Sequence, residues 1–133
     1  MRIFLDTNIL VYTLDTRNPA KQDKARELLR SDHSFVISTQ VCQELFVTAV
    51  AKCAMAPLWA KHFIRSLTWS ELVTITPSHI EQAIDVHILN QISFWDGLII
   101  SAAQTAKCSV LWTEELNDGQ TIAGVKVKNP FLA

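Results

Sequence analysis

The chain has 133 residues, 49% of them hydrophobic, and a net charge of −1, which suits one domain that buries roughly two thirds of its unfolded surface. Its three cysteines, Cys42, Cys53 and Cys108, include no closely spaced pair, so we expect reduced core thiols and no disulfide framework. No apolar run reaches the length of about 18 residues that a membrane span needs, and no signal-peptide pattern opens the chain. We therefore expect a soluble, cytoplasmic protein.

The first informative stretch is the apolar run at residues 3–5, which ends at Asp6. Three consecutive large apolar residues predict a short strand buried on both faces, as in a parallel sheet. Asp6 then lies at the carboxyl end of the strand, where open α/β sheets bind ligands. Thr7 and Asn8 favour a helix that begins near Ile9. Asp6 is thus either a helix cap or a ligand-binding carboxylate, and this stretch leaves both open.

Strands and helices alternate in the next part of the chain. We predict a helix from Pro19 to near Ser31, a strand at residues 35–37 and a helix at residues 40–53. This alternation is typical of βαβ winding around a parallel sheet. Glu44 lies at the edge of the apolar stripe of the third of these segments, where it is either a solvated flank or a carboxylate that reaches toward the strand ends.

Two more amphipathic helices and a strand are predicted in the middle of the chain. The first helix starts at Pro57, and its apolar stripe is core or, in part, a contact with a second subunit; the stripe consists of Trp59, Phe63, Ile64 and Leu67. Residues 71–75 predict a third strand. The second helix runs from Pro77 to about Asn90, and the side chains that we expect to face inward are Ile80, Ala83, Ile84 and Ile88.

Asp96 follows Ser93 and opens a strongly apolar helix that includes residues 98–103. A helical wheel places Asp96 in an apolar sector, where an unpaired carboxylate is costly to bury. One interpretation is a capping box with Ser93 as the N-cap. The other is a carboxylate aimed at the carboxyl edge of the sheet, where backbone N–H groups help to hold it charged.

The C-terminal part predicts a buried strand at residues 109–112, an acidic turn and an alternating edge strand at residues 125–128. Each acid of the turn is, taken alone, best explained as a surface residue; they are Glu114, Glu115 and Asp118.

The acids gain significance together, because Asp6, Glu44, Asp96 and the acids after Thr113 all belong to segments just beyond strand ends. In a parallel sheet these ends converge at one edge. Carboxylates so close together require a cation, and oxygen ligands without a histidine or cysteine set select Mg²⁺ or Mn²⁺. One or two such ions can activate water against a phosphodiester.

At these residues the chain resembles the PIN-domain family and, within it, the VapC-type ribonuclease toxins of bacterial toxin-antitoxin pairs. The blocks that carry the resemblance are LDTNIL at 5–10, STQVCQE at 38–44, SFWD at 93–96, TEE at 113–115 and GVKVKNPF at 124–131. The resemblance implies one PIN-like domain over residues 1–133, a three-layer α/β/α sandwich on a parallel sheet of four or five strands. It also implies Mg²⁺- or Mn²⁺-dependent endonucleolytic cleavage of RNA, a homodimer, and inhibition by a cognate antitoxin.

The resemblance also assigns site residues. The first three acidic positions of the family correspond to Asp6, Glu44 and Asp96, and the supporting polar positions to Asn8 and Thr113.

Two positions depart from the family. The fourth acidic position usually reads Thr or Ser, any residue, then Asp, whereas here it is Glu115, and Asp118 is a candidate for part of its role. Gly97 stands where relatives commonly have alanine, and it weakens the first turn of its helix.

Three functions stay open on the sequence. The first is a metal-dependent ribonuclease toxin, and the second is a PIN-like RNA- or protein-binding module that is catalytically weak or silent. The third, an Mg²⁺-dependent phosphatase with Asp6 as nucleophile, is disfavoured because Asn8 stands where a second aspartate is expected. Basic side chains on helix faces are the candidates for RNA phosphate contacts; they are Arg17, Lys21, Lys24, Lys61 and Arg65.

Overall fold

The computed structural model describes residues 1–132. Its strands are β1 (Arg2–Leu5), β2 (Ser34–Ser38), β3 (Glu71–Val73), β4 (Val110–Trp112), β5 (Thr121–Ile122) and β6 (Val125–Lys128). Its helices are α1 (Thr7–Leu14), α2 (Pro19–Leu29), α3 (Thr39–Lys52), α4 (Pro57–Arg65), α5 (Pro77–Asn90) and α6 (Phe94–Thr105), with a 3₁₀ helix η1 (Leu67–Trp69). The predicted alternation of strands and helices is confirmed.

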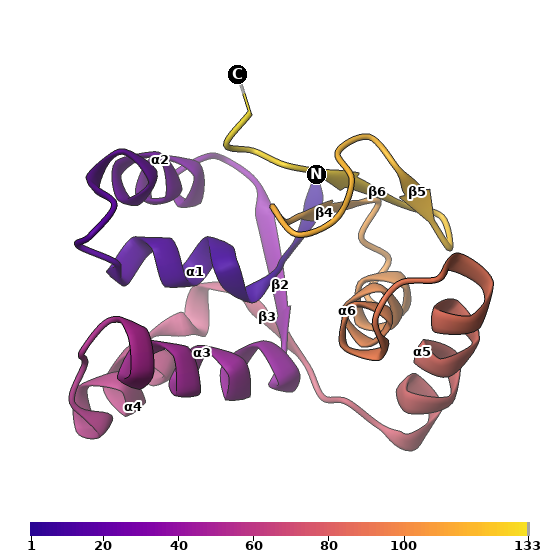
Figure 1. Cartoon of the computed structure of the whole chain (residues 1–133), viewed down its shortest axis with the longest axis horizontal. Coiled ribbons are helices and arrows are strands. Elements are labelled where there is room, and N and C mark those ends of the chain that lie inside the picture. The colour runs from indigo at the N-terminus through magenta and orange to yellow at the C-terminus, as the bar shows by residue number, and fades with distance from the viewer. Residues whose placement is uncertain (133) are drawn as a thin grey trace.

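The strands form one sheet in the order β3-β2-β1-β4-β6-β5, which has six strands and not the expected four or five because the short β5 adds to the five parallel ones. All neighbouring strands are parallel except β5, which pairs antiparallel with β6. Helices α1 to α4 lie on one face and α5 and α6 on the other (Figure 1), so the expected three-layer α/β/α sandwich is confirmed. Residues 125–128 are not the edge strand we predicted, because β5, which is too short to show a periodic pattern, pairs along their outer side.

The centre of the sheet is apolar and buried. Ile3, Phe4 and Leu5 of β1 are at most 1% exposed, as expected for a strand with helices on both faces. Cys108 is buried in the core and the half-buried Cys42 packs against it, as expected, whereas the half-buried Cys53 is not part of the core. No helix within residues 1–132 combines the length and the apolarity that crossing a membrane requires.

The chain leaves β1 toward β2 on one side and later adds β4 on the other. The sheet therefore changes winding direction at β1, which is where open α/β sheets bind ligands.

The inward face that we predicted for α5 is largely wrong. Ala83 is buried as expected, whereas Ile80, Ile84 and Ile88 are exposed. The reason is that α5 packs mainly on α6 (Figure 1) and not flat on the sheet, so a narrower face is covered. Part of that face is polar, since the buried His79 ring lies 2.9 Å from the hydroxyl of Thr105 on α6.

The apolar stripe predicted for α4 does not lie entirely in the core. Trp59 is 67% exposed, Phe63 and Ile64 are half-buried, and Leu67 is buried in η1, after α4 has ended. The outward position of Trp59 leaves the predicted contact with a second subunit open.

Gly97 has a packing role that the sequence did not reveal. A Cβ atom at this position would lie 2.7 Å from the carbonyl oxygen of Ala83, which is too close for a backbone atom that cannot move independently. Glycine thus permits the close approach of α5 and α6 beside Asp96.

We expect Gly97→Ala to lower the free energy of unfolding by about 1–3 kcal/mol, because the added methyl group overpacks the contact with α5. Helix propensity alone would instead raise it by about 1 kcal/mol. Urea unfolding measures whether the free energy of unfolding falls or rises. The matched control compares Lys24→Ala with Lys24→Gly at an exposed position of α2, where the alanine variant should be the more stable. Stabilisation by Gly97→Ala would contradict the close approach.

Candidate metal centre

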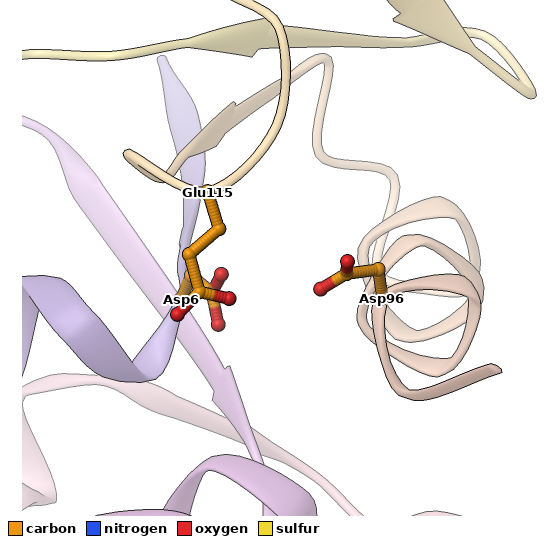
Figure 2. Close-up of side chains that lie close together, drawn as sticks. All are labelled: Asp6, Asp96 and Glu115. Atoms are coloured by element: carbon orange, nitrogen blue, oxygen red, sulfur yellow. The ribbon is translucent and has the colours of Figure 1, made fainter. Parts of the chain in front are cut away.

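Three carboxylates from distant parts of the chain meet beyond the carboxyl end of β1. Asp6, Asp96 and Glu115 each offer an oxygen atom, and these atoms all lie within 4.8 Å of one another. Figure 2 shows Asp96 pointing from the first turn of α6 toward Asp6, which directly follows β1, and Glu115, which lies in the loop after β4. We call these three residues the acidic cluster.

Asp6 is at once a helix cap and a member of the acidic cluster. Its Oδ1 accepts the backbone N–H of Thr7 at 2.7 Å, which makes Asp6 the N-cap of α1. The helix therefore begins at Thr7 and not near Ile9 as predicted, because Asp6 itself supplies the capping oxygen. The structure confirms the helix-cap interpretation, whereas the ligand-binding role of Asp6 stays a prediction that its place in the acidic cluster supports.

The environment of Asp6 opposes its negative charge. The residue is 5% exposed, and burial, with added repulsion from Glu115 and Asp96, raises its pKa from the ordinary 3.8 to about 7. The Thr113 hydroxyl donates to Oδ2 at 2.7 Å, and this bond and the Thr7 N–H lower the pKa without overcoming the burial. Near neutral pH the carboxyl group is thus easily protonated unless a cation is present.

Thr113 and Asn8 connect two of the three segments of the site, the start of α1 and the loop after β4. The Thr113 hydroxyl donates to Asp6 and accepts the backbone N–H of Glu115 at 3.1 Å. The Asn8 amide donates to Thr113 at 3.3 Å and to Asp6 at 3.4 Å. A single buried hydroxyl therefore fixes both the Asp6 carboxylate and the start of the loop that carries Glu115.

Asp96 occupies the first turn of α6. Its backbone N–H donates to the Ser93 hydroxyl at 3.0 Å, so Ser93 is the N-cap, as the capping-box interpretation proposed. The Asp96 carboxylate, however, belongs to the acidic cluster (Figure 2). The cap fixes the first turn and thereby the direction of this side chain.

The remaining predicted acids, Glu44 and Asp118, are not members of the acidic cluster. Glu44 lines the same pocket but is not one of the three clustered residues; its carboxylate accepts the Thr7 hydroxyl at 2.6 Å and the Gln40 amide at 3.3 Å. Asp118 does not line the pocket, and its carboxylate accepts the backbone N–H of Asn129 at 2.7 Å. The loop has by then turned back toward β6, so the structure does not bring Asp118 to the cluster.

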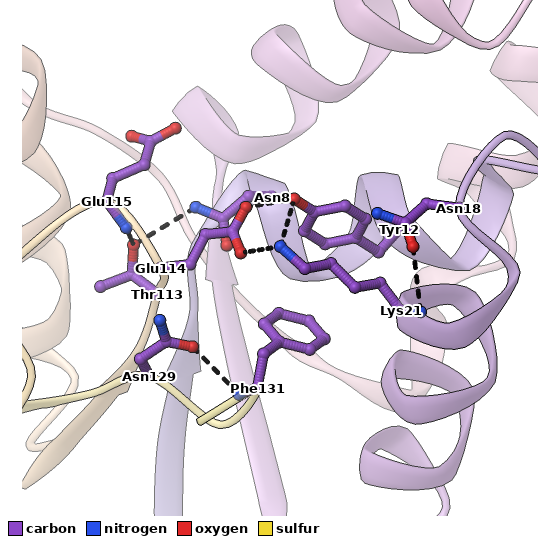
Figure 3. A network of polar contacts seen from close by, with 9 residues as sticks. All are labelled: Asn8, Tyr12, Asn18, Lys21, Thr113, Glu114, Glu115, Asn129 and Phe131. Carbon is purple, nitrogen blue, oxygen red and sulfur yellow. Dashed lines mark hydrogen bonds and ion pairs between the residues drawn. The ribbon is translucent and has the colours of Figure 1, made fainter. Parts of the chain in front are cut away.

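A separate network holds Glu114 away from the cluster. Its carboxylate accepts from the Tyr12 hydroxyl and from Lys21 Nζ, the latter at 2.7 Å, and Lys21 lies over the rings of Tyr12 and Phe131 (Figure 3). Glu114 thus pairs with Lys21, whereas the next residue, Glu115, belongs to the acidic cluster. Burial and the nearby Asp96 charge raise the pKa of Glu115. Lys21, which we expected to contact RNA, is already engaged in an ion pair.

The acidic cluster opens into a pocket of about 890 Å³. Of the basic residues predicted to contact RNA, only Arg17 lines it among the described residues; Arg17 also pairs with Asp15 at 2.9 Å. The sequence prediction missed Lys52 and Trp95, which line the same pocket. Their positions depend on how α1, α3 and α6 pack together, which no local pattern indicates.

The residues present fit a hard divalent cation. Two amide oxygens, Asn8 Oδ1 and Gln40 Oε1, are buried and lack a hydrogen-bond partner in the described part of the chain, and both residues line the pocket. The three clustered carboxylates provide an all-oxygen donor set, which Mg²⁺ and Mn²⁺ prefer. Such a cation also relieves the repulsion that opposes ionisation of the cluster.

Comparison with known proteins agrees with the fold. The family model for the PIN domain matches residues 3–117, and comparison with curated protein sequences gives no match. A toxin-antitoxin complex from Klebsiella pneumoniae shares 21% identity over 97% of this chain and 98% of that chain, with a TM-score of 0.73. Mycobacterium tuberculosis VapC20, described as a sarcin-ricin loop cleaving toxin, shares 19% identity over 93% of this chain and 98% of that chain, with a TM-score of 0.69. VapBC2 from Rickettsia felis, bound to promoter DNA, shares 20% identity over 97% of this chain and 98% of that chain, with a TM-score of 0.68.

Proposed function

The chain belongs to the PIN-domain family, and we propose that it is a divalent-metal-dependent endoribonuclease that acts as the toxin of a toxin-antitoxin pair. The observation that carries this proposal is the acidic cluster. Three carboxylates separated by up to 109 positions of sequence share one pocket open to solvent, with ligand atoms within 4.8 Å. A purely structural role does not explain why a fold would retain such repulsion beside a buried aspartate.

Each residue of the site has a distinct part in this proposal. Asp6, Asp96 and Glu115 would hold Mg²⁺ or Mn²⁺, and Glu44 adds negative charge in the same pocket. An ion bound there would supply the positive charge that lowers the pKa of a water molecule and orients it against phosphorus. Thr113 orients the Asp6 carboxylate through a 2.7 Å hydrogen bond. Arg17 and Lys52 line the pocket, where they can pair with phosphates of the substrate.

The proposal includes a cognate antitoxin and a homodimer. The similar protein from Klebsiella pneumoniae is part of a toxin-antitoxin complex, and this chain exposes large apolar side chains that suit protein contacts. Those on α4 and α5 are Leu58, Trp59, Ile80, Ile84, Ile88 and Leu89. Action on cellular RNA accords with the predicted cytoplasmic location, which stays a prediction.

The test is cleavage of a labelled single-stranded RNA by the purified protein. We expect cutting with Mg²⁺ or Mn²⁺, none with excess EDTA, and recovery when Mn²⁺ is added back, because the acidic cluster needs the cation. Calorimetric titration with Mn²⁺ separates the alternatives. Metal binding without cleavage would favour a catalytically silent binding module, and cleavage in EDTA would contradict the metal-dependent mechanism.

A further inference from the structure

Trp95 is an exposed aromatic side chain directly beside the acidic cluster. Trp95 is one of the residues that line the 890 Å³ pocket, its neighbour in sequence is Asp96, and it is 61% exposed. A tryptophan with so much free surface is costly to leave in water, and this one buries too little to be explained by the core. Its position points to a ligand that enters the pocket with the reacting group.

The backbone around Trp95 is held in place although its ring is open to solvent. The amide of Gln40, a buried residue of α3, donates to the Trp95 carbonyl oxygen at 3.0 Å, which ties the start of α6 to α3. The Phe94 ring meets the Trp95 ring edge-on, with centroids 5.1 Å apart. The flat indole surface is therefore presented from a fixed position, as an aromatic stacking platform requires.

The charges of the pocket indicate the path of a nucleic-acid strand. Helices α1 and α3 pack side by side and both begin at the edge of the sheet that carries the acidic cluster (Figure 1). Arg17 follows the far end of α1 and Lys52 ends α3, and both line the pocket. Arg17 thus lies beyond one α1 length, roughly 12 Å, from Asp6, and Lys52 lies about one α3 length, roughly 21 Å, from the start of α3. Trp95, in contrast, directly precedes the clustered Asp96 in α6.

We propose that Trp95 stacks on an unpaired nucleobase that flanks the phosphodiester held at the acidic cluster, while Arg17 and Lys52 bind phosphates on the other side. This rests on the proposed function and narrows its substrate to RNA that is single-stranded or looped out at the cleavage site. In an intact duplex the bases stack on each other and are not free to lie on the indole. Stacking on an aromatic face also tolerates any base, so it selects for strand form and not for sequence.

The test measures binding of two fluorescent probes by anisotropy in an Asp6→Asn background, with Mn²⁺ present. One probe is a single-stranded 12-residue oligoribonucleotide, and the other has the same ribose-phosphate backbone without bases. Trp95→Ala should weaken binding of the RNA about 5- to 100-fold and change binding of the abasic probe less than about twofold. Trp95→Phe should recover most of the lost affinity. Trp59→Ala removes an equally exposed tryptophan outside the pocket and should change neither.

The possible failures are distinguishable. Equal effects of Trp95→Ala on both probes, or none on either, would overturn the stacking assignment and leave the proposed function intact. Unchanged RNA binding with dissociation of a dimer in sedimentation would instead assign Trp95 to a protein interface. If the wild-type protein does not cut RNA and the Asp6→Asn protein does not bind it, both proposals are overturned.

Discussion

Replacing Asp6 by asparagine is expected to reduce metal-dependent RNA cleavage by about 100-fold or more. Loss of a residue that merely supports a metal ligand typically costs about 10- to 100-fold, and Asp6 is itself one of the three clustered carboxylates. The fold should survive, because an asparagine oxygen can still accept the Thr7 N–H and asparagine is a good N-cap. Initial cleavage rates over a range of Mn²⁺ concentrations, together with Mn²⁺ calorimetry, measure the effect.

Asp118→Asn is the matched control for this prediction. It removes one carboxylate charge from the loop after β4, yet Asp118 lies outside the pocket and an asparagine oxygen can still accept the Asn129 N–H. This variant should cleave RNA at the wild-type rate. Wild-type cleavage by Asp6→Asn would refute the metal-binding role of the cluster, and a large loss in Asp118→Asn would show that the fourth acidic position involves more than Glu115.

The features that the sequence predicts well depend on local patterns or on parallel topology. The apolar run before Asp6 was enough to predict a buried strand, since only a strand covered on both faces tolerates three large apolar residues in succession. The meeting of Asp6 and a loop acid was predictable because β1 and β4 are parallel and share one carboxyl edge; this reason does not extend to Asp96, whose helix follows α5 and not a strand. Neither inference needs any knowledge of how the helices pack.

The features that were missed depend on contacts between elements. Ile80, Ile84 and Ile88 follow a helical period, but which residues of α5 are buried is decided by α6, which approaches closely at Gly97. The choice between Glu115 and Asp118 follows from the hydrogen bond of Asp118 to Asn129, a contact across the loop. Lys52 joins the pocket only because α3 packs along α1. Hydrophobic periodicity predicts that a helix or strand is present more reliably than it predicts which elements pack against it.

The metal-free protein is expected to lose stability as the pH rises from 5 to 8. The folded state keeps the proton of Asp6 up to about pH 7, whereas the unfolded chain releases it near 3.8. Between these values the folded state binds more protons, so the free energy of unfolding falls with increasing pH, by about 3 kcal/mol between pH 5 and 8. The raised pKa of Glu115 acts in the same direction. Asp15, whose pKa is lowered by Arg17, acts in the opposite direction but only below about pH 4.

Urea unfolding at pH 5 and pH 8, in EDTA and in Mn²⁺, measures this prediction. In EDTA the midpoint should fall by about 1 M or more at the higher pH, whereas Mn²⁺ should remove or reverse the fall, because the cation binds the ionised carboxylates of the folded state alone. Asp6→Asn removes the titrating group and should flatten most of the dependence in EDTA. Equal wild-type midpoints at both pH values in EDTA would mean that the Asp6 carboxylate is stabilised without a cation. The repulsion on which the metal-centre assignment rests would then be absent.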